Sequence, residues 1–129
     1  MLTQGAGAAW AFALLATVVI LFQCALAFGA PWGEYTLGGK YPGRLPFKAR
    51  IGSAFAGVVL AAFSAIMLAR AGVLDSGWPG GLRIAAWVVV GYLVLCLIAN
   101  VLTPSRRERR LWAPFVTLML AASVMVAMG

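Results

Sequence analysis

Long uninterrupted apolar runs alternate along the chain with short segments that are polar, charged or rich in glycine. Four of these runs reach the length of about 17–25 residues that a helix needs to cross a hydrocarbon core about 30 Å thick. They cover approximately residues 8–28, 51–71, 82–102 and 111–128. A membrane β-strand would instead alternate apolar and polar positions over about ten residues. The pattern therefore predicts four membrane-spanning α-helices.

The composition agrees with lipid as the main solvent. The chain has 129 residues, of which 64% are hydrophobic and 10% charged, whereas soluble domains are about 45–50% apolar and about 25% charged. We expect residues 1–129 to form a single all-α integral membrane domain, a four-transmembrane-helix bundle. The net charge of +7 does not indicate a nucleic acid, because the basic residues flank the apolar runs. The expected partners are the bilayer and its anionic lipids.

The basic residues are distributed unevenly between the two sides of the predicted bundle. Arg70 and Arg83 are the two that lie on the side of the second loop and both termini. The positive-inside rule then places both termini on the non-cytoplasmic side. The predicted location is the bacterial inner (cytoplasmic) membrane, as a multi-pass protein. The first and third loops carry the other eight basic residues, namely Lys40, Arg44, Lys48, Arg50, Arg106, Arg107, Arg109 and Arg110.

Side chains that commonly carry out chemistry are few. There is no histidine, and the two cysteines, Cys24 and Cys96, do not form a metal-binding or redox motif. We therefore expect no metal and no cofactor, and we assign no catalytic residue.

Polar residues inside the spans are the first place to look for a site, because they are costly in lipid. Tyr92, Cys96 and Asn100 follow one another at four-residue steps in the third span. Gln23 near the end of the first span and Ser53 near the start of the second lie on the same side of the membrane. The geometry predicts that these residues converge in the cytoplasmic half of the bundle. They would form either a small ligand pocket or hydrogen bonds between helices.

The first loop, residues 29–50, is much longer than a helical hairpin requires. It contains many glycines and prolines, but also aromatic residues, so we expect it to be ordered and to fold over the cytoplasmic mouth with Trp32 and Tyr35 buried. Glu34, its one acid, is expected to pair with Lys48 or Arg50, and a catalytic or proton-carrying role is the alternative. The candidate ligand-binding residues are thus Gln23, Trp32, Glu34, Tyr35, Arg50, Ser53, Tyr92, Cys96 and Asn100.

The basic residues of these two loops have two possible roles beside orientation. They could contact anionic lipid, or those of the first loop could join its glycines in holding an anion such as a phosphate. The candidates for contact with anionic lipid are Lys40, Arg44, Lys48, Arg106, Arg107, Arg109 and Arg110.

Small residues recur at four-residue steps in the second span, at Ser53, Gly57, Ala61 and Ala65. We expect them to share one face of the helix and to let a neighbouring backbone approach closely. Both ordinary packing within the bundle and contact with a second copy of the chain would use such a face.

The first loop contains the segment Pro-Trp-Gly-Glu-Tyr-Thr-Leu-Gly-Gly-Lys-Tyr-Pro-Gly at residues 31–43. With the four-span layout, it resembles a family of small uncharacterised four-span membrane proteins of bacteria. The resemblance covers the loop and the layout, and it implies no activity. The glutamate in the first span of small multidrug transporters is absent, as are the membrane motifs of fluoride channels and the CxxC of vitamin K reductase-like enzymes.

These observations favour a protein that binds a small or amphipathic molecule at the cytoplasmic mouth. An extended form of the hypothesis is that the protein also transports this molecule. The alternative is a non-catalytic assembly subunit that forms a homo-oligomer or packs against a larger membrane partner. A membrane enzyme acting on lipid headgroups is a lesser alternative, because the catalytic side chains are so few.

Overall fold

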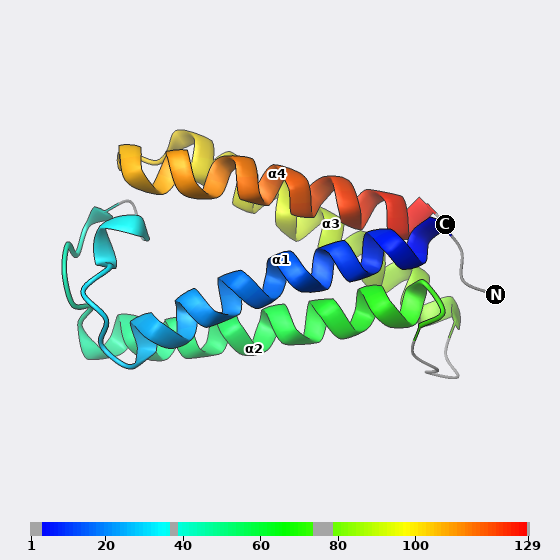
Figure 1. Cartoon of the computed structure of the whole chain (residues 1–129), viewed down its shortest axis with the longest axis horizontal. Coiled ribbons are helices and arrows are strands. Elements are labelled where there is room, and N and C mark those ends of the chain that lie inside the picture. The colour runs from blue at the N-terminus through cyan, green and yellow to red at the C-terminus, as the bar shows by residue number, and fades with distance from the viewer. Residues whose placement is uncertain (1–3, 37–38, 74–78, 129) are drawn as a thin grey trace.

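The computed structural model describes residues 4–36, 39–73 and 79–128. They form four α-helices, and no strand occurs within these ranges. The helices run alternately up and down, so that the start of the first and the end of the last lie at the same end of the bundle (Figure 1). The predicted all-α four-helix fold is confirmed. The elements are α1 (Gln4–Ala27), the short 3₁₀ helix η1 (Gly33–Tyr35), α2 (Phe47–Arg70), α3 (Pro79–Leu102) and α4 (Arg106–Met128).

Each of the four helices contains a segment of 22 to 24 residues that is long and apolar enough to cross a membrane. At a rise of 1.5 Å per residue, such a helix is about 33–36 Å long, slightly more than the hydrocarbon core. The chain is therefore a multi-pass membrane protein.

The helices extend beyond the apolar runs at several ends. The second begins at Phe47 rather than at residue 51, and the fourth begins at Arg106 rather than at residue 111. At the fourth, the Glu108 N–H donates a 3.2 Å hydrogen bond to Ser105 Oγ, which satisfies one of the free N–H groups of the first turn. Arginine and lysine are also good helix formers. A capped, charged first turn therefore stays helical outside the apolar run.

The bundle consists of two hairpins, because α1 packs most extensively on α2 and α3 packs most extensively on α4. The apolar core lies toward the end that holds the termini, where Phe12, Met67, Val89 and Met119 are almost completely buried. It joins the first half of α1 and α3 to the second half of α2 and α4. Toward the first and third loops the two hairpins diverge (Figure 1). The tightly packed half thus supports a more open half.

The small-residue stripe of α2 needs a correction. Ser53 and Gly57 are buried, but Ala61 and Ala65 are exposed. A helix turns 100° per residue, so each four-residue step rotates the side chain by about 40°, and three steps turn it about 120° away from the starting face. The buried face of α2 instead continues from Gly57 to Leu60 and Met67.

Candidate functional site

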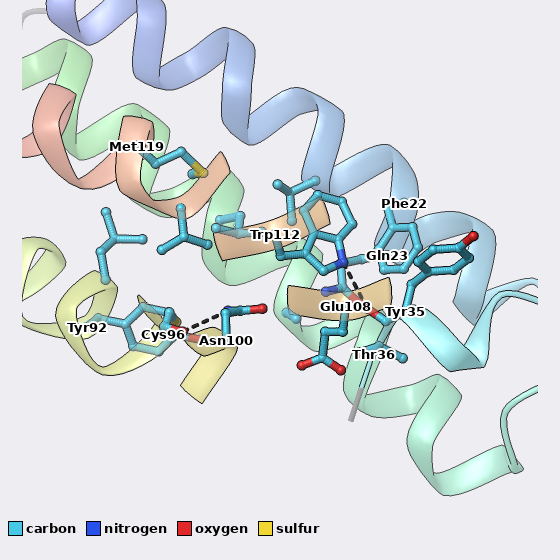
Figure 2. Close-up of a pocket in the computed structure, with 15 residues that line it drawn as sticks. Phe22, Gln23, Tyr35, Thr36, Tyr92, Cys96, Asn100, Glu108, Trp112 and Met119 are labelled. Carbon is cyan, nitrogen blue, oxygen red and sulfur yellow. Dashed lines mark hydrogen bonds between the residues drawn. The ribbon is translucent and has the colours of Figure 1, made fainter. Parts of the chain in front are cut away.

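A cavity of about 180 Å³ lies in the more open half of the bundle (Figure 2). All four long helices contribute to its wall, and the first loop closes one side with Tyr35 and Thr36. Its wall combines aromatic and aliphatic groups with amides, hydroxyls, a thiol and a carboxylate. The lining residues are Val19, Phe22, Gln23, Tyr35, Thr36, Ala56, Leu60, Tyr92, Leu93, Cys96, Asn100, Glu108, Trp112, Val116 and Met119.

Five of the nine candidate ligand-binding residues line this cavity, namely Gln23, Tyr35, Tyr92, Cys96 and Asn100. The Asn100 side chain donates a 2.7 Å hydrogen bond from Nδ2 to the main-chain oxygen of Cys96, within its own helix. Its amide oxygen points away from Cys96, toward the Glu108 side of the cavity (Figure 2). This amide therefore presents an acceptor to the cavity, while one of its two N–H donors is used within α3.

Gln23 reaches the cavity because α1 and α2 pack closely beside it. A Cβ atom added at Gly57 would lie 3.9 Å from the Cβ of Gln23, an ordinary van der Waals distance, so α2 lies directly against α1 at this level. The neighbouring Cys24 is exposed, and both it and Cys96 are free thiols.

Three other candidates lie outside the cavity wall. The Trp32 ring stacks on Phe22 with 6.3 Å between centroids and 6° between planes, but 45% of Trp32 is exposed. The Arg50 Nε donates a 2.9 Å hydrogen bond to the main-chain oxygen of Ala27, and Ser53 is buried elsewhere. The expected burial of Trp32 is thus wrong. The side chain of Glu34 lies outside the described residues, as does its expected pairing with Lys48 or Arg50.

Trp112 occupies the buried position that was expected of Trp32. It is 8% exposed, and its ring meets Phe22 edge-on at 4.7 Å and Phe115 at 5.5 Å. Its indole Nε1 donates a 2.9 Å hydrogen bond to the main-chain oxygen of Tyr35 in η1. This bond fastens the first loop to α4, so the loop folds back over this end of the bundle.

Gly33 allows the loop to close on itself. Its N–H donates a 2.8 Å hydrogen bond to the main-chain oxygen of Gly43. A Cβ added at Gly33 would collide with the oxygen of Tyr41 and lie 2.6 Å from that of Gly43. A residue with a side chain would therefore force these two segments of the loop apart.

Glu108 is the cavity residue of greatest chemical consequence that the sequence interpretation missed. It is only 9% exposed and lines the cavity, although it stands between arginines in the third loop segment. A signal was present, since Ser105-Arg106-Arg107-Glu108 is a Ser-x-x-Glu capping motif before an apolar run. That motif places Glu108 in the first helical turn, where its side chain can point inward.

The basic residues lie outside the cavity. Among the described residues, no lysine or arginine lines it, and the seven candidates for contact with anionic lipid are exposed. Some are engaged with the protein itself: the Arg44 side chain rests on Gly29, where an added Cβ would lie 2.8 Å from Nε. Arg109 donates a 3.2 Å hydrogen bond to the oxygen of Thr103. Their contact with lipid stays a prediction.

Two arginine side chains also form hydrogen bonds with the C-terminal carbonyl groups of helices other than their own. Ala27, the acceptor of Arg50, is the last residue of α1. At the opposite end of the bundle, Arg70 in the last turn of α2 donates a 3.3 Å hydrogen bond to the oxygen of Ala127 in α4. Carbonyl groups at helix C-termini lack partners within the helix and carry a partial negative charge. These arginines therefore stabilise helix ends and join neighbouring helices.

Within the described parts of the chain, no group of three histidine, cysteine, aspartate or glutamate side chains comes together to hold a metal ion. Comparison of the chain with protein-family models, with curated proteins and with solved structures gives no match.

Proposed function

We propose that this chain is a protein of the bacterial cytoplasmic membrane that binds a small or amphipathic molecule in the cavity between its two hairpins. The first and third loops would face the cytoplasm, as their eight basic residues indicate. The observation that carries the proposal is the cavity itself, which gathers polar side chains from three helices and the first loop within an otherwise apolar bundle. Polar groups at such a depth are costly unless they have partners or a ligand.

The volume limits what can enter. An apolar cavity of about 150 Å³ holds one benzene molecule, so 180 Å³ admits a group only slightly larger. A larger amphipathic molecule would bury its headgroup in the cavity and leave its chain outside. Transport would require the loop to open, and a hydrogen bond such as that from the Trp112 indole to the main-chain oxygen of Tyr35 is weak enough to break during such a step.

An assembly subunit is the second candidate. Ala61 and Ala65 leave a small-residue patch exposed on α2, and in lipid such a patch lets another helix approach closely. A larger membrane protein would then copurify with the chain.

Native mass spectrometry of the protein extracted from its own membrane in dodecyl maltoside tests these alternatives. Ala56 lines the cavity, so Ala56→Phe should fill it. Ala61 is exposed on the same helix, so Ala61→Phe makes the same chemical change outside the cavity. We expect a defined extra mass on wild type and on Ala61→Phe, and its loss on Ala56→Phe.

The two proposals differ in the masses that they predict. A protein without any bound small molecule, in wild type as in Ala56→Phe, would contradict the binding proposal. A copurifying larger chain that Ala61→Phe removes would support the assembly subunit instead.

A further inference from the structure

We infer that the molecule held in this cavity carries a small organic ammonium group, primary or quaternary. This inference rests on the proposed function and adds the chemical class of the ligand. It follows from the charge, the aromatic content and the size of the cavity taken together.

The charge of the wall is the first argument. Glu108 places a carboxylate in a wall that, over the described residues, contains no basic side chain. Figure 2 shows this carboxylate on the same side of the Trp112 indole as Asn100. Because charges interact more strongly away from water, a carboxylate that is 9% exposed attracts a cation and repels an anion. The exposed arginines outside contribute less, since solvent and salt screen them.

The aromatic side chains are the second argument. Phe22, Tyr35, Tyr92 and Trp112 all line the cavity, and they come from α1, the loop, α3 and α4. Aromatic faces attract cations, and several rings around one site are the usual means of holding a quaternary ammonium group. The Asn100 amide oxygen adds a neutral acceptor for the N–H groups of a primary amine.

The size of the cavity is the third argument. A trimethylammonium group has fewer non-hydrogen atoms than benzene and fits within 180 Å³. Both a free amine and the headgroup of a zwitterionic phospholipid carry this chemistry. In the second case the phosphate would remain outside, on the side of the exposed arginines.

Choline and 3,3-dimethyl-1-butanol provide a direct test, because they have the same shape and differ in the charged nitrogen. Saturation-transfer NMR in dodecyl maltoside, a detergent without charge, gives both dissociation constants. We expect wild type to bind choline at least about tenfold more tightly than the alcohol, as one buried charged contact predicts. Glu108→Gln should remove this preference, and Glu108→Asp should retain part of it.

A matched control separates the local carboxylate from the net charge. Arg83 is exposed near the end of the bundle that holds the termini. If net charge decided the preference, Arg83→Gln would strengthen choline binding by as much as Glu108→Gln weakens it. We expect Arg83→Gln to leave choline binding unchanged within about twofold. If Glu108→Gln does not fold, the comparison of the two compounds on wild type decides alone.

Further measurements distinguish a lipid from a free amine as the source of the ammonium group. They also separate a failure of the ammonium inference from a failure of the binding proposal. Dihexanoylphosphatidylcholine should bind more tightly than choline if the ligand is a lipid, and no more tightly if it is a free amine. Equal affinity of wild type for choline and for the alcohol would overturn the ammonium inference and leave the binding proposal standing. Absence of any bound mass in native spectra would overturn the binding proposal itself.

Discussion

The indole of Trp112 in α4 donates a hydrogen bond to the main-chain oxygen of Tyr35, 77 residues earlier in the chain. Because a main-chain carbonyl accepts it, the bond specifies the position of the loop and does not depend on the side chain of Tyr35. It joins the first hairpin to the second at the end where the helices diverge. Phe22 packs against the same indole and so brings α1 into the same contact.

Trp112→Phe should loosen the first loop without unfolding the bundle. It removes the hydrogen bond, worth about 1 kcal/mol, and retains an aromatic ring against Phe22. We expect amide hydrogen exchange at Tyr35 and Thr36 to become several times faster, up to about tenfold. Trp10 is half exposed on α1, so Trp10→Phe serves as the control. Unchanged exchange in Trp112→Phe would show that the bond does not hold the loop.

Gly33→Ala should damage the loop more than Gly43→Ala. At Gly33 the added methyl group meets main-chain oxygens, which predicts a loss of about 2–3 kcal/mol. At Gly43 the space is open, but φ is +85°, which predicts about 1 kcal/mol. Gly52→Ala, within α2 and with open space, should be neutral or slightly stabilising. Unfolding in mixed SDS and dodecyl maltoside micelles gives the three values, and a reversed order for Gly33 and Gly43 would contradict this account.

Arg50→Gln should destabilise the first hairpin by about 1 kcal/mol. It removes a charged donor from the carbonyl end of α1, where a positive charge is favourable. Arg110 is exposed on α4, and Arg110→Gln removes the same charge from the same side of the bundle. In the same micelle titration, the free energy of unfolding of Arg110→Gln should lie within about 0.5 kcal/mol of the wild-type value. Equal losses in both variants would indicate that general electrostatics, not the bond to Ala27, stabilises the hairpin.

The orientation in the membrane follows from eight basic residues on one side and two on the other. An epitope tag at either terminus should bind an antibody added outside intact spheroplasts. A tag inserted beside Arg110 should be reached only after the membrane is permeabilised. The opposite result for both positions would invert the proposed topology and move the open end of the bundle out of the cytoplasm.

The four spans could be predicted from the sequence because lipid requires long apolar segments with all main-chain groups bonded internally. The helix ends were less predictable, since hydropathy does not register a capping serine such as Ser105 or the helical preference of the arginines that follow it. The position of the apolar core in one half of the bundle depends on where the hairpins diverge. Local sequence patterns do not predict that point.

The candidate site was partly predictable for geometric reasons. In an antiparallel bundle, Gln23 at the end of α1 and Asn100 at the end of α3 must reach the same level, and both line the cavity. Which of two tryptophans would be buried depends on tertiary packing, and Trp112 rather than Trp32 fills that place. Glu108 was overlooked because four arginines surround it in sequence, although its helix turns it inward.

The bond between Tyr35 and Trp112 also sets an order of events during synthesis. A ribosome adds about 5–20 residues per second, so the 77 residues between them take roughly 4–15 s. During that interval the rest of the first loop, α2 and α3 are made, but α4, the helix that closes the cavity, is not yet complete. The first hairpin is therefore in the membrane before the hydrogen bond from Trp112 to its loop can form. A chain that stops after α3 would contain most of the polar residues without enclosing them in a cavity.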